Sequence, residues 1–220
     1  MLREIVPGHA AVAEAVGEAA DAPLFPEEEA AVPRAAGRRR REFATGRACA
    51  RQALSDLGVH PAPIGRGARG APDWPDTIVG SITHCSGYCA AVVARADCLP
   101  AIGIDAEPHL PLPDGVASVV ARPAELSRLA CLRRSEPGFH WDRLLFSAKE
   151  SVYKAWFPLT RRWLGFQEAE IDLRADGSFL VRILDGPASA GLAHDQPAGF
   201  FAGQWIITRD LILTAVTVGE

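Results

Sequence analysis

Two segments with helical spacing, each followed by short strand-like runs, constrain the fold of this chain most. In the first segment apolar residues recur at helical intervals over residues 38–57, and Gly58 supplies a stop. In the second they recur at the same spacing over residues 141–155, and we expect this helix to end before Pro158. Each helix is therefore predicted to bury one side.

The strand-like runs are separated by turn-forming residues. A loop rich in Gly and Pro spans residues 60–75. The expected strands cover residues 77–82, 88–95 and 101–107 in the first half, and residues 169–173, 178–184, 199–208 and 211–218 in the second. The first 37 residues are expected to form a partly helical lead-in. We therefore predict an α+β fold in which each half is a helix followed by a meander of strands, as in a duplicated unit.

Composition excludes several classes of protein. A chain of 220 residues with 48% hydrophobic residues can bury the core of one large domain or of two small ones. A net charge of -4 argues against a dedicated nucleic-acid binder, which needs a basic excess. The N-terminus does not resemble a signal peptide and no apolar run is long enough to cross a membrane, so we expect a cytoplasmic protein.

The five cysteines are scattered along the chain. This distribution favours reduced thiols over a disulfide framework. His84, Cys85 and Cys89 are close in sequence, but they lack the second close pair that is typical of zinc sites. We therefore expect no zinc centre here.

Two acidic residues stand two positions apart in the strand-like segment GIDAE. Strand alternation directs the carboxylates of Asp105 and Glu107 to one face, with Ala106 pointing away. Two oxygen donors of this kind suit Mg²⁺, which completes its shell with water and substrate phosphate oxygens. A pair of solvated acids at the end of a strand is the alternative.

Two further segments carry groups that can act on a phosphate. In FSAKESVYKAWF, Glu150 and Lys154 are helical neighbours beside Lys149. Glu150 can complete a metal site or accept a proton, and Lys154 can neutralise a departing phosphate; an exposed salt bridge is the alternative. In SITHCSGY, His84 can donate a hydrogen bond to a phosphate or can be a structural residue.

Arginines gather on the first helix and on the loop after it. At about 100° per residue, Arg40, Arg47 and Arg51 fall within roughly 40° of one another. Such a set can hold a terminal phosphate or can be a solvated basic face. Arg66 and Arg69 can add to it, since the glycines of this loop allow a close approach of the backbone to a ligand.

Taken together and in order, the motifs resemble one family. GR-ACAR, RGAP-WP, GSITHC, GIDAEPH and FSAKESVYKAWFP, within residues 38–166, are similar to the Sfp/EntD-type phosphopantetheinyl transferases, especially their actinobacterial EntD-like branch. The resemblance implies two similar subdomains related by a pseudo-two-fold axis, over residues 1–103 and 104–220. The first would bind the nucleotide of coenzyme A, the second would carry the metal and the catalytic helix, and the active site would lie in the cleft between them.

The resemblance also implies a role for each matching residue. Mg²⁺, or Mn²⁺ in its place, would be held by Asp105, the carbonyl of Ala106, Glu107 and Glu150. Catalysis would rest on Glu150, Lys154 and Asp105. Coenzyme A would be contacted by Arg39, Arg47, Arg66, Gly67, Ala68, Arg69, Thr83, His84, Asp105, Lys149 and Lys154.

Two positions stand apart from this pattern. The helical wheel favours Arg40 for the phosphate contact, whereas the family position is Arg39, and we follow the family because helix starts are placed only to within about 2–4 residues. Ala106 stands where some relatives carry a third acidic residue, so water would fill that part of the metal shell.

The implied reaction moves phosphopantetheine from coenzyme A to a serine of an apo acyl or peptidyl carrier protein and releases adenosine 3',5'-bisphosphate. We expect a monomer, and the pathway stays open among fatty acid, polyketide, non-ribosomal peptide and siderophore synthesis. Two alternatives are a non-catalytic coenzyme A-binding module and a metal-dependent phosphohydrolase, although no second acidic motif of the two-metal type is visible. For carrier docking, one candidate is the patch Arg161, Arg162, Trp163, Leu164 and Phe166, which core packing would explain nearly as well.

Overall fold

The computed structural model describes residues 1–17, 21–60, 62–184 and 200–219. The N-terminal half contains helices α1 (Pro26–Ala30) and α2 (Gly37–Asp56) and strands β1 (Ala11–Val16), β2 (Gly65–Arg66), β3 (Pro72–Asp73), β4 (Ile78–Cys85) and β5 (Tyr88–Arg95). The C-terminal half contains strand β6 (Ala101–Pro108), helices α3 (Val116–Val120), α4 (Pro123–Ser135) and α5 (Trp141–Thr160), and strands β7 (Ala169–Leu173), β8 (Ser178–Ile183), β9 (Phe200–Ile207) and β10 (Leu211–Val218).

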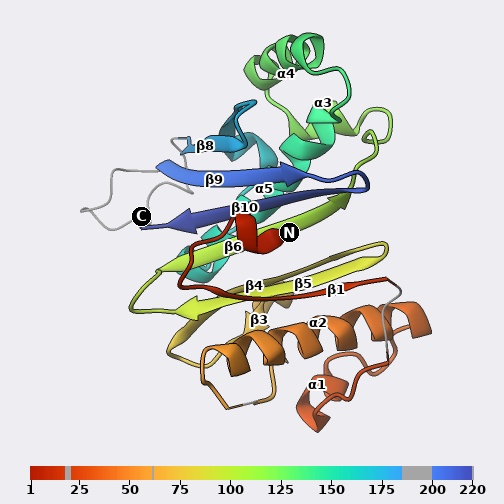
Figure 1. The fold of residues 1–220 in the computed structure, drawn as a ribbon, viewed down its shortest axis with the longest axis vertical. Coiled ribbons are helices and arrows are strands. Elements are labelled where there is room, and N and C mark those ends of the chain that lie inside the picture. Colours follow the sequence, from red (N-terminus) through yellow and green to blue (C-terminus); the bar gives the residue numbers. More distant parts are fainter. Residues whose placement is uncertain (18–20, 61, 185–199, 220) are drawn as a thin grey trace.

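Each half is an antiparallel sheet with one long helix on it (Figure 1). The first sheet has the order β1-β5-β4 and packs against α2, and the second has the order β6-β10-β9-β8-β7 and packs against α5. The predicted α+β class is therefore confirmed. The expected boundary between residues 103 and 104 falls inside β6, whereas the sheets divide between β5 and β6.

Side-chain hydroxyls join the two sheets where β4 lies beside β6. The backbone N–H of Ile104 donates to Ser81 Oγ at 3.1 Å, and that of Ala106 donates to Thr83 Oγ1 at 3.0 Å. The two hydroxyls are two residues apart on β4 and the two amides are two residues apart on β6. They therefore fix the register between the halves, with Asp105 between the two amides.

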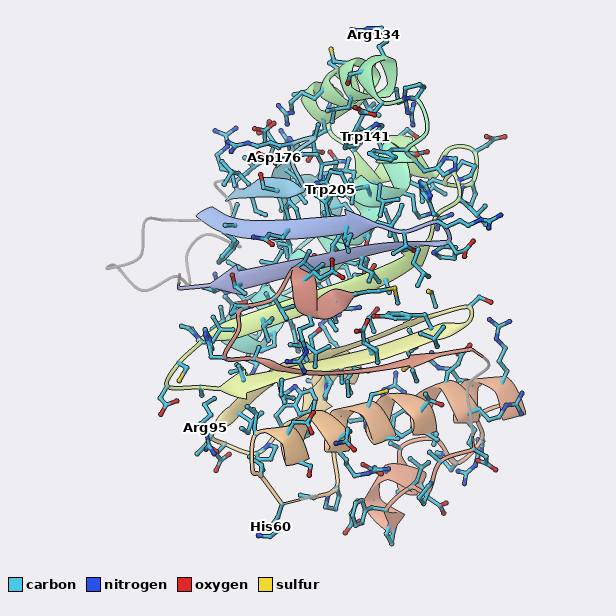
Figure 2. The ribbon with its side chains drawn as sticks, viewed as in Figure 1. His60, Arg95, Arg134, Trp141, Asp176 and Trp205 are labelled. Carbon is cyan, nitrogen blue, oxygen red and sulfur yellow. The ribbon has the colours of Figure 1, made fainter. Side chains whose placement is uncertain are left out.

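A glycine allows α5 to lie directly on β6. A Cβ added at Gly103 would meet the carbonyl oxygen of Ser151 at 2.0 Å and the backbone nitrogen of Ala155 at 2.6 Å. No side chain fits in this gap, so helix and strand can approach this closely only with glycine at position 103. Aromatic rings pack between α5 and its sheet. Trp141 of α5 lies beside Trp205 of β9 (Figure 2), and their ring centroids are 5.6 Å apart.

The expected helical lead-in is wrong for residues 11–16, which form β1. This strand pairs antiparallel with β5, from Ala11 opposite Val93 to Val16 opposite Tyr88. The sequence AVAEAV has too many alanines to favour a strand by itself. Pairing with β5 supplies the stability that local propensity lacks. The strand expected over residues 199–208 begins at Gly199, and this residue lies outside the described residues.

The expected end of the second helix before Pro158 is also wrong, because α5 continues to Thr160. Proline lacks an N–H and so removes the hydrogen bond to the carbonyl four residues earlier. In the last turn this loss is tolerated. The helix ends at Arg161, whose N–H donates to the carbonyl of Phe157 at 2.8 Å and whose φ of 56° is left-handed.

Two other expectations concern single features. All five cysteines are free thiols, as predicted. Among the described helices, none has both the length and the apolar composition that a membrane crossing requires.

A buried carboxylate fastens α1 to the rest of the N-terminal half. Glu28 is 0% exposed and accepts hydrogen bonds from Arg51 at 2.7 and 2.9 Å and from the backbone N–H of Ile64 at 3.0 Å. The next residue, Glu29, instead forms an ion pair with Arg40 at the surface. The two neighbouring glutamates therefore form a buried and an exposed version of the same interaction.

We expect Glu28→Ala to lower the free energy of unfolding by about 3–5 kcal/mol, because it strands a largely buried guanidinium and a backbone amide. Glu29→Ala is the matched control and should change it by less than about 1 kcal/mol, since its pair is exposed. Urea unfolding of the two variants and the parent protein measures both values. Similar losses in the two variants would contradict the assignment.

Candidate active site

A cleft of about 600 Å³ lies between the two halves and is lined by α2, the loop after it, β4 and α5. The predicted site residues in its lining are Arg39, Arg47, Arg66, Gly67, Arg69, His84, Glu150 and Lys154. The remaining predicted residues, which do not line it, are Ala68, Thr83, Asp105, Ala106, Glu107 and Lys149. The structure therefore brings side chains from both halves to one cavity, and several of the others lie just behind its wall.

Asp105 lies at the centre of a network that joins β4, β6 and α5. Its carboxylate is buried, and Oδ1 accepts hydrogen bonds from Lys154 Nζ at 2.7 Å and Thr83 Oγ1 at 3.3 Å. Its other oxygen, Oδ2, accepts one from Ser147 Oγ at 2.9 Å. Lys154 also donates to the carbonyl of Ile104 at 3.0 Å. Lys154 lines the cleft, so the ammonium group of Lys154 connects Asp105 to the cavity.

The charge of Asp105 affects the pKa of two more carboxyl groups, Glu150 and Glu107. Burial raises the pKa of Glu150, and the charge of Asp105 adds to this rise while Lys154 opposes it. Burial and then Asp105 also raise the pKa of Glu107, although Arg143 forms an ion pair with it at 2.8 Å. Among the described residues, no donor lies within hydrogen-bond distance of the Glu150 carboxylate. Asp105, Glu107 and Glu150 are therefore three neighbouring carboxyl groups beside two cations, Lys154 and Arg143.

This donor set fits a hard divalent cation. No group of three or more His, Cys, Asp or Glu side chains in the described part of the chain is already placed to hold a metal ion. Three mutually repelling carboxyl groups are nevertheless the oxygen ligands that Mg²⁺ and Mn²⁺ prefer. The N–H of Ala106 points to β4, and the carbonyl of a strand residue points to the same side as its N–H. The carbonyl of Ala106 therefore faces β4, the side on which Lys154 reaches Asp105.

Arg39 and His84 form a pair at one end of the cleft. Arg39 Nη1 lies 2.8 Å from His84 Nε2, and because a guanidinium can only donate, His84 must accept through Nε2. Burial lowers the pKa of His84, and the charge of Arg39 lowers it further. Arg40 instead forms an ion pair with Glu29 at 2.9 Å. The structure thus brings Arg39 into the cleft, and the helical-wheel preference for Arg40 is not supported.

Arg47 is largely committed to the fold. It is buried, and it donates to the carbonyls of Ile64 at 2.7 Å and Gly65 at 3.0 Å while its guanidinium lies 4.3 Å from the ring centroid of Phe43. Burial lowers its pKa to about 10. Arg47 therefore holds the start of the loop that carries Arg66, in addition to lining the cleft.

Arg69 connects the two halves at the rim of the cleft. Its backbone is left-handed, with a φ of 55°, and its guanidinium lies 5.1 Å from the ring centroid of Trp163. Trp163 in turn packs against Tyr153 of α5, with ring centroids 5.0 Å apart and the planes tilted by 57°. In the expected docking patch Trp163 is 58% exposed, whereas Leu164 is buried and Phe166 packs on Phe146. Of the apolar residues in that patch, Leu164 therefore belongs to the core, Phe166 is half-buried, and Trp163 stays accessible.

Lys149 is not brought to the cleft. Its ammonium group is buried and donates to Glu125 at 2.8 Å and to the carbonyls of Val120 at 2.9 Å, Phe166 at 2.7 Å and Ala169 at 3.0 Å. These partners leave it no free donor, so the structure gives Lys149 a structural role in place of the expected contact with coenzyme A. Sequence reasoning missed Glu125, although a proline at the first helical position and an acidic residue two positions later are signals of a helix start.

Comparison with known proteins identifies relatives of both halves. A family model described as the 4'-phosphopantetheinyl transferase N-terminal domain matches residues 27–94, and one described as the 4'-phosphopantetheinyl transferase superfamily matches residues 101–208. The two matches divide at the same place as the two sheets.

Individual relatives cover most of the chain. The 4'-phosphopantetheinyl transferase Svp of Streptomyces mobaraensis is 49% identical over 99% of this chain and 89% of its own length. The 4'-phosphopantetheinyl transferase PptT of Mycobacterium tuberculosis is 48% identical, covering 88% and 86%. Enterobactin synthase component D of Salmonella typhi is 36% identical, covering 84% and 74%.

The role of Lys149 can be tested through folding. We expect Lys149→Met to lower the free energy of unfolding by about 3–5 kcal/mol, because it strands the buried carboxylate of Glu125. Combining it with Glu125→Gln should cost less than the sum of the two single changes, since the stranded charge is gone. Urea unfolding of the three variants measures the cycle, with Arg134→Met on the exposed side of α4 as a control expected within about 0.5 kcal/mol. Strict additivity would contradict the pairing.

Proposed function

This chain belongs to the 4'-phosphopantetheinyl transferase superfamily, and we propose that the cleft between its two halves is where it moves the phosphopantetheine arm. The donor is coenzyme A, and the acceptor is a serine of an apo acyl or peptidyl carrier protein. The observation that carries this assignment is the convergence of Asp105, Glu150 and Lys154, from a strand and a distant helix segment, beside a cavity with several arginines.

The site would hold one divalent cation, Mg²⁺ or Mn²⁺. Asp105, Glu107 and Glu150 would be its carboxylate ligands, and the carbonyl of Ala106 would lie beside them. When bound, the cation offsets the charge of the diphosphate, which otherwise repels a nucleophile. Burial and then the charge of Asp105 raise the pKa of Glu107 and Glu150, and the bound cation would offset that charge.

The residues of α5 have distinct roles in the transfer. The serine oxygen attacks the phosphorus that bears the pantetheine arm, and the bond from that phosphorus to the nucleotide phosphate breaks. In the described part of the chain no donor is hydrogen-bonded to the Glu150 carboxylate, and burial raises its pKa, so this carboxylate is suited to accept the serine proton. The ammonium group of Lys154 offsets the charge that develops on adenosine 3',5'-bisphosphate as it leaves.

The N-terminal half would hold the nucleotide end of coenzyme A. Arg39, Arg66 and Arg69 line the cleft, and guanidiniums bind phosphates through paired hydrogen bonds. His84 already accepts from Arg39, so its remaining ring N–H is the group available to a phosphate oxygen or to water.

The two alternative functions predict different outcomes in a transfer assay. A coenzyme A-binding module would leave a carrier protein unmodified, and a phosphohydrolase would release free phosphopantetheine without an acceptor. The relatives named as transferases favour the transfer reaction over both. Incubation with coenzyme A, Mg²⁺ and a panel of apo carrier domains from polyketide, non-ribosomal peptide and siderophore systems, read by intact mass, separates the three and identifies the carrier.

We expect Glu150→Ala to lower the rate of holo-carrier formation by at least about 100-fold, the lower range for loss of general base catalysis. The assay follows transfer from labelled coenzyme A to an apo carrier protein. Glu136→Ala, which removes an exposed carboxylate at the end of α4, is the control and should keep full activity. Full activity of the Glu150→Ala protein would remove Glu150 from the mechanism.

The same residue should cost stability when no metal is present. Because the pKa of Glu150 is raised in the folded protein, ionisation opposes folding above the ordinary carboxyl range and has no effect once pH falls below about 4. We therefore expect metal-free Glu150→Gln to melt at a higher temperature than the parent at pH 7.5, with the difference vanishing at acidic pH.

Melting curves recorded with a chelator, and again with added Mn²⁺, test this expectation. Mn²⁺ should raise the melting temperature of the parent protein more than that of the Glu150→Gln variant. A variant less stable than the parent at pH 7.5 in the chelator would show that the carboxylate is not under charge repulsion.

A further inference from the structure

Two fully buried hydroxyl groups touch the network of Asp105 and have no part in the chemistry described above. Ser147 of α5 and Thr214 of β10 are both 0% exposed. Ser147 Oγ donates to Asp105 Oδ2 at 2.9 Å and lies 3.0 Å from Thr214 Oγ1. Resting on the proposed function, we propose that Ser147 and Thr214 are positioning residues that hold the Asp105 carboxylate in the orientation needed to bind the divalent cation.

The direction of these hydrogen bonds is fixed by chemistry. Asp105 is ion-paired with Lys154, and a carboxylate in that state can only accept. Ser147 must therefore give its one proton to Asp105. In its contact with Thr214 it must accept, so Thr214 is the donor. The single proton of Thr214 is shared between Ser147 Oγ and the carbonyl of Ser147, which lies 3.1 Å away. The proton of Ser147 is thus committed to Asp105.

The fold places Ser147 in contact with this carboxylate and Thr214 in contact with Ser147. Thr214 is directly opposite Asp105 in the β10–β6 pairing, so the two side chains share the face of the sheet that packs against α5. Ser147 and Lys154 are seven residues apart on α5, about two turns, and so lie on the same side of that helix. Helix α5 therefore donates hydrogen bonds to both oxygens of Asp105, from Ser147 to Oδ2 and from Lys154 to Oδ1.

These two hydrogen bonds determine which oxygen of Asp105 remains available to a divalent cation. Oδ2 is held within the protein interior by a neutral donor, and a cation cannot displace it without leaving the buried Ser147 hydroxyl without its acceptor. Oδ1 faces Lys154, which reaches the cleft and is the partner that an incoming cation would compete with. Loss of groups that orient metal ligands typically weakens metal affinity about 10–100-fold, and this is the effect expected here.

The test compares two serines of the same helix. Ser151 is as deeply buried as Ser147, but its hydroxyl donates only to the carbonyl of Ala148 within α5, at 2.9 Å. We expect Ser147→Ala to raise the Mn²⁺ dissociation constant about tenfold, measured by electron paramagnetic resonance of free Mn²⁺ with coenzyme A present. Ser151→Ala should leave it unchanged. In the transfer assay, added metal should restore most of the turnover of Ser147→Ala.

A second pair of variants keeps the test decisive if Ser147→Ala does not fold. Thr214→Val keeps the shape and removes the hydroxyl, whereas Thr214→Ser keeps the hydroxyl. The first should weaken Mn²⁺ binding and the second should not, with circular dichroism melting confirming that both are folded. Parent-like Mn²⁺ affinity in Ser147→Ala, or in Thr214→Val where the former is unfolded, would overturn the proposal.

The two proposals fail in distinguishable ways. If the parent protein makes holo-carrier but removal of the hydroxyls leaves Mn²⁺ binding unchanged, the positioning role alone is wrong. If the parent makes no holo-carrier with any carrier domain, the proposed function is wrong, and the Mn²⁺ measurement still reports whether Ser147 orients Asp105.

Discussion

The ion pair between Asp105 and Lys154 is the interaction on which the site depends, because it lies where the two sheets and α5 meet. Thr83 of β4 donates to Asp105 Oδ1 and accepts from the backbone N–H of Ala106. One hydroxyl therefore serves both the seam between the halves and the central carboxylate. Gly103 allows α5 to approach β6 closely enough for Lys154 to reach across. A small displacement where β4 contacts β6 would therefore move β4, β6 and α5 together.

The charge balance around this ion pair is unfavourable by itself. Asp105 has a cation at 2.7 Å, but Glu150 has only the more distant effect of Lys154, and the pKa of Glu150 is raised despite it. Glu107 shares the effect even with Arg143 beside it. Buried groups that are kept in spite of such a penalty are typical of functional sites, where activity and stability compete. Lys149, a neighbour in sequence with every donor satisfied, shows what a purely structural charge looks like in the same helix.

Much of the fold follows from periodicity, whereas the site depends on which side of a helix each residue faces. The strand predicted over residues 88–95 and the helix predicted over residues 38–57 match β5 and nearly match α2, because their patterns are strong. Strand β1 could not be predicted, since its stability comes from pairing with β5 and not from its alanines. Lys149 and Lys154 are five residues apart, roughly 140° on a helix, so both could not face the cleft. The wheel also places Ser147 beside Lys154, but nothing in the sequence indicates that Thr214 lies opposite Asp105.

The two halves contribute different groups to the cleft. The N-terminal half supplies His84 and most of the arginines, whereas the C-terminal half supplies Glu150 and Lys154 and, behind the wall, Asp105. A ligand with a nucleotide phosphate at one end and a diphosphate at the other would contact both sets at once. The halves are already fixed by Ser81 and Thr83 at the seam, so such a ligand would meet a preformed arrangement. Under the proposed function, the binding energy of the nucleotide end would then help to place the diphosphate against Lys154 and so orient it for transfer.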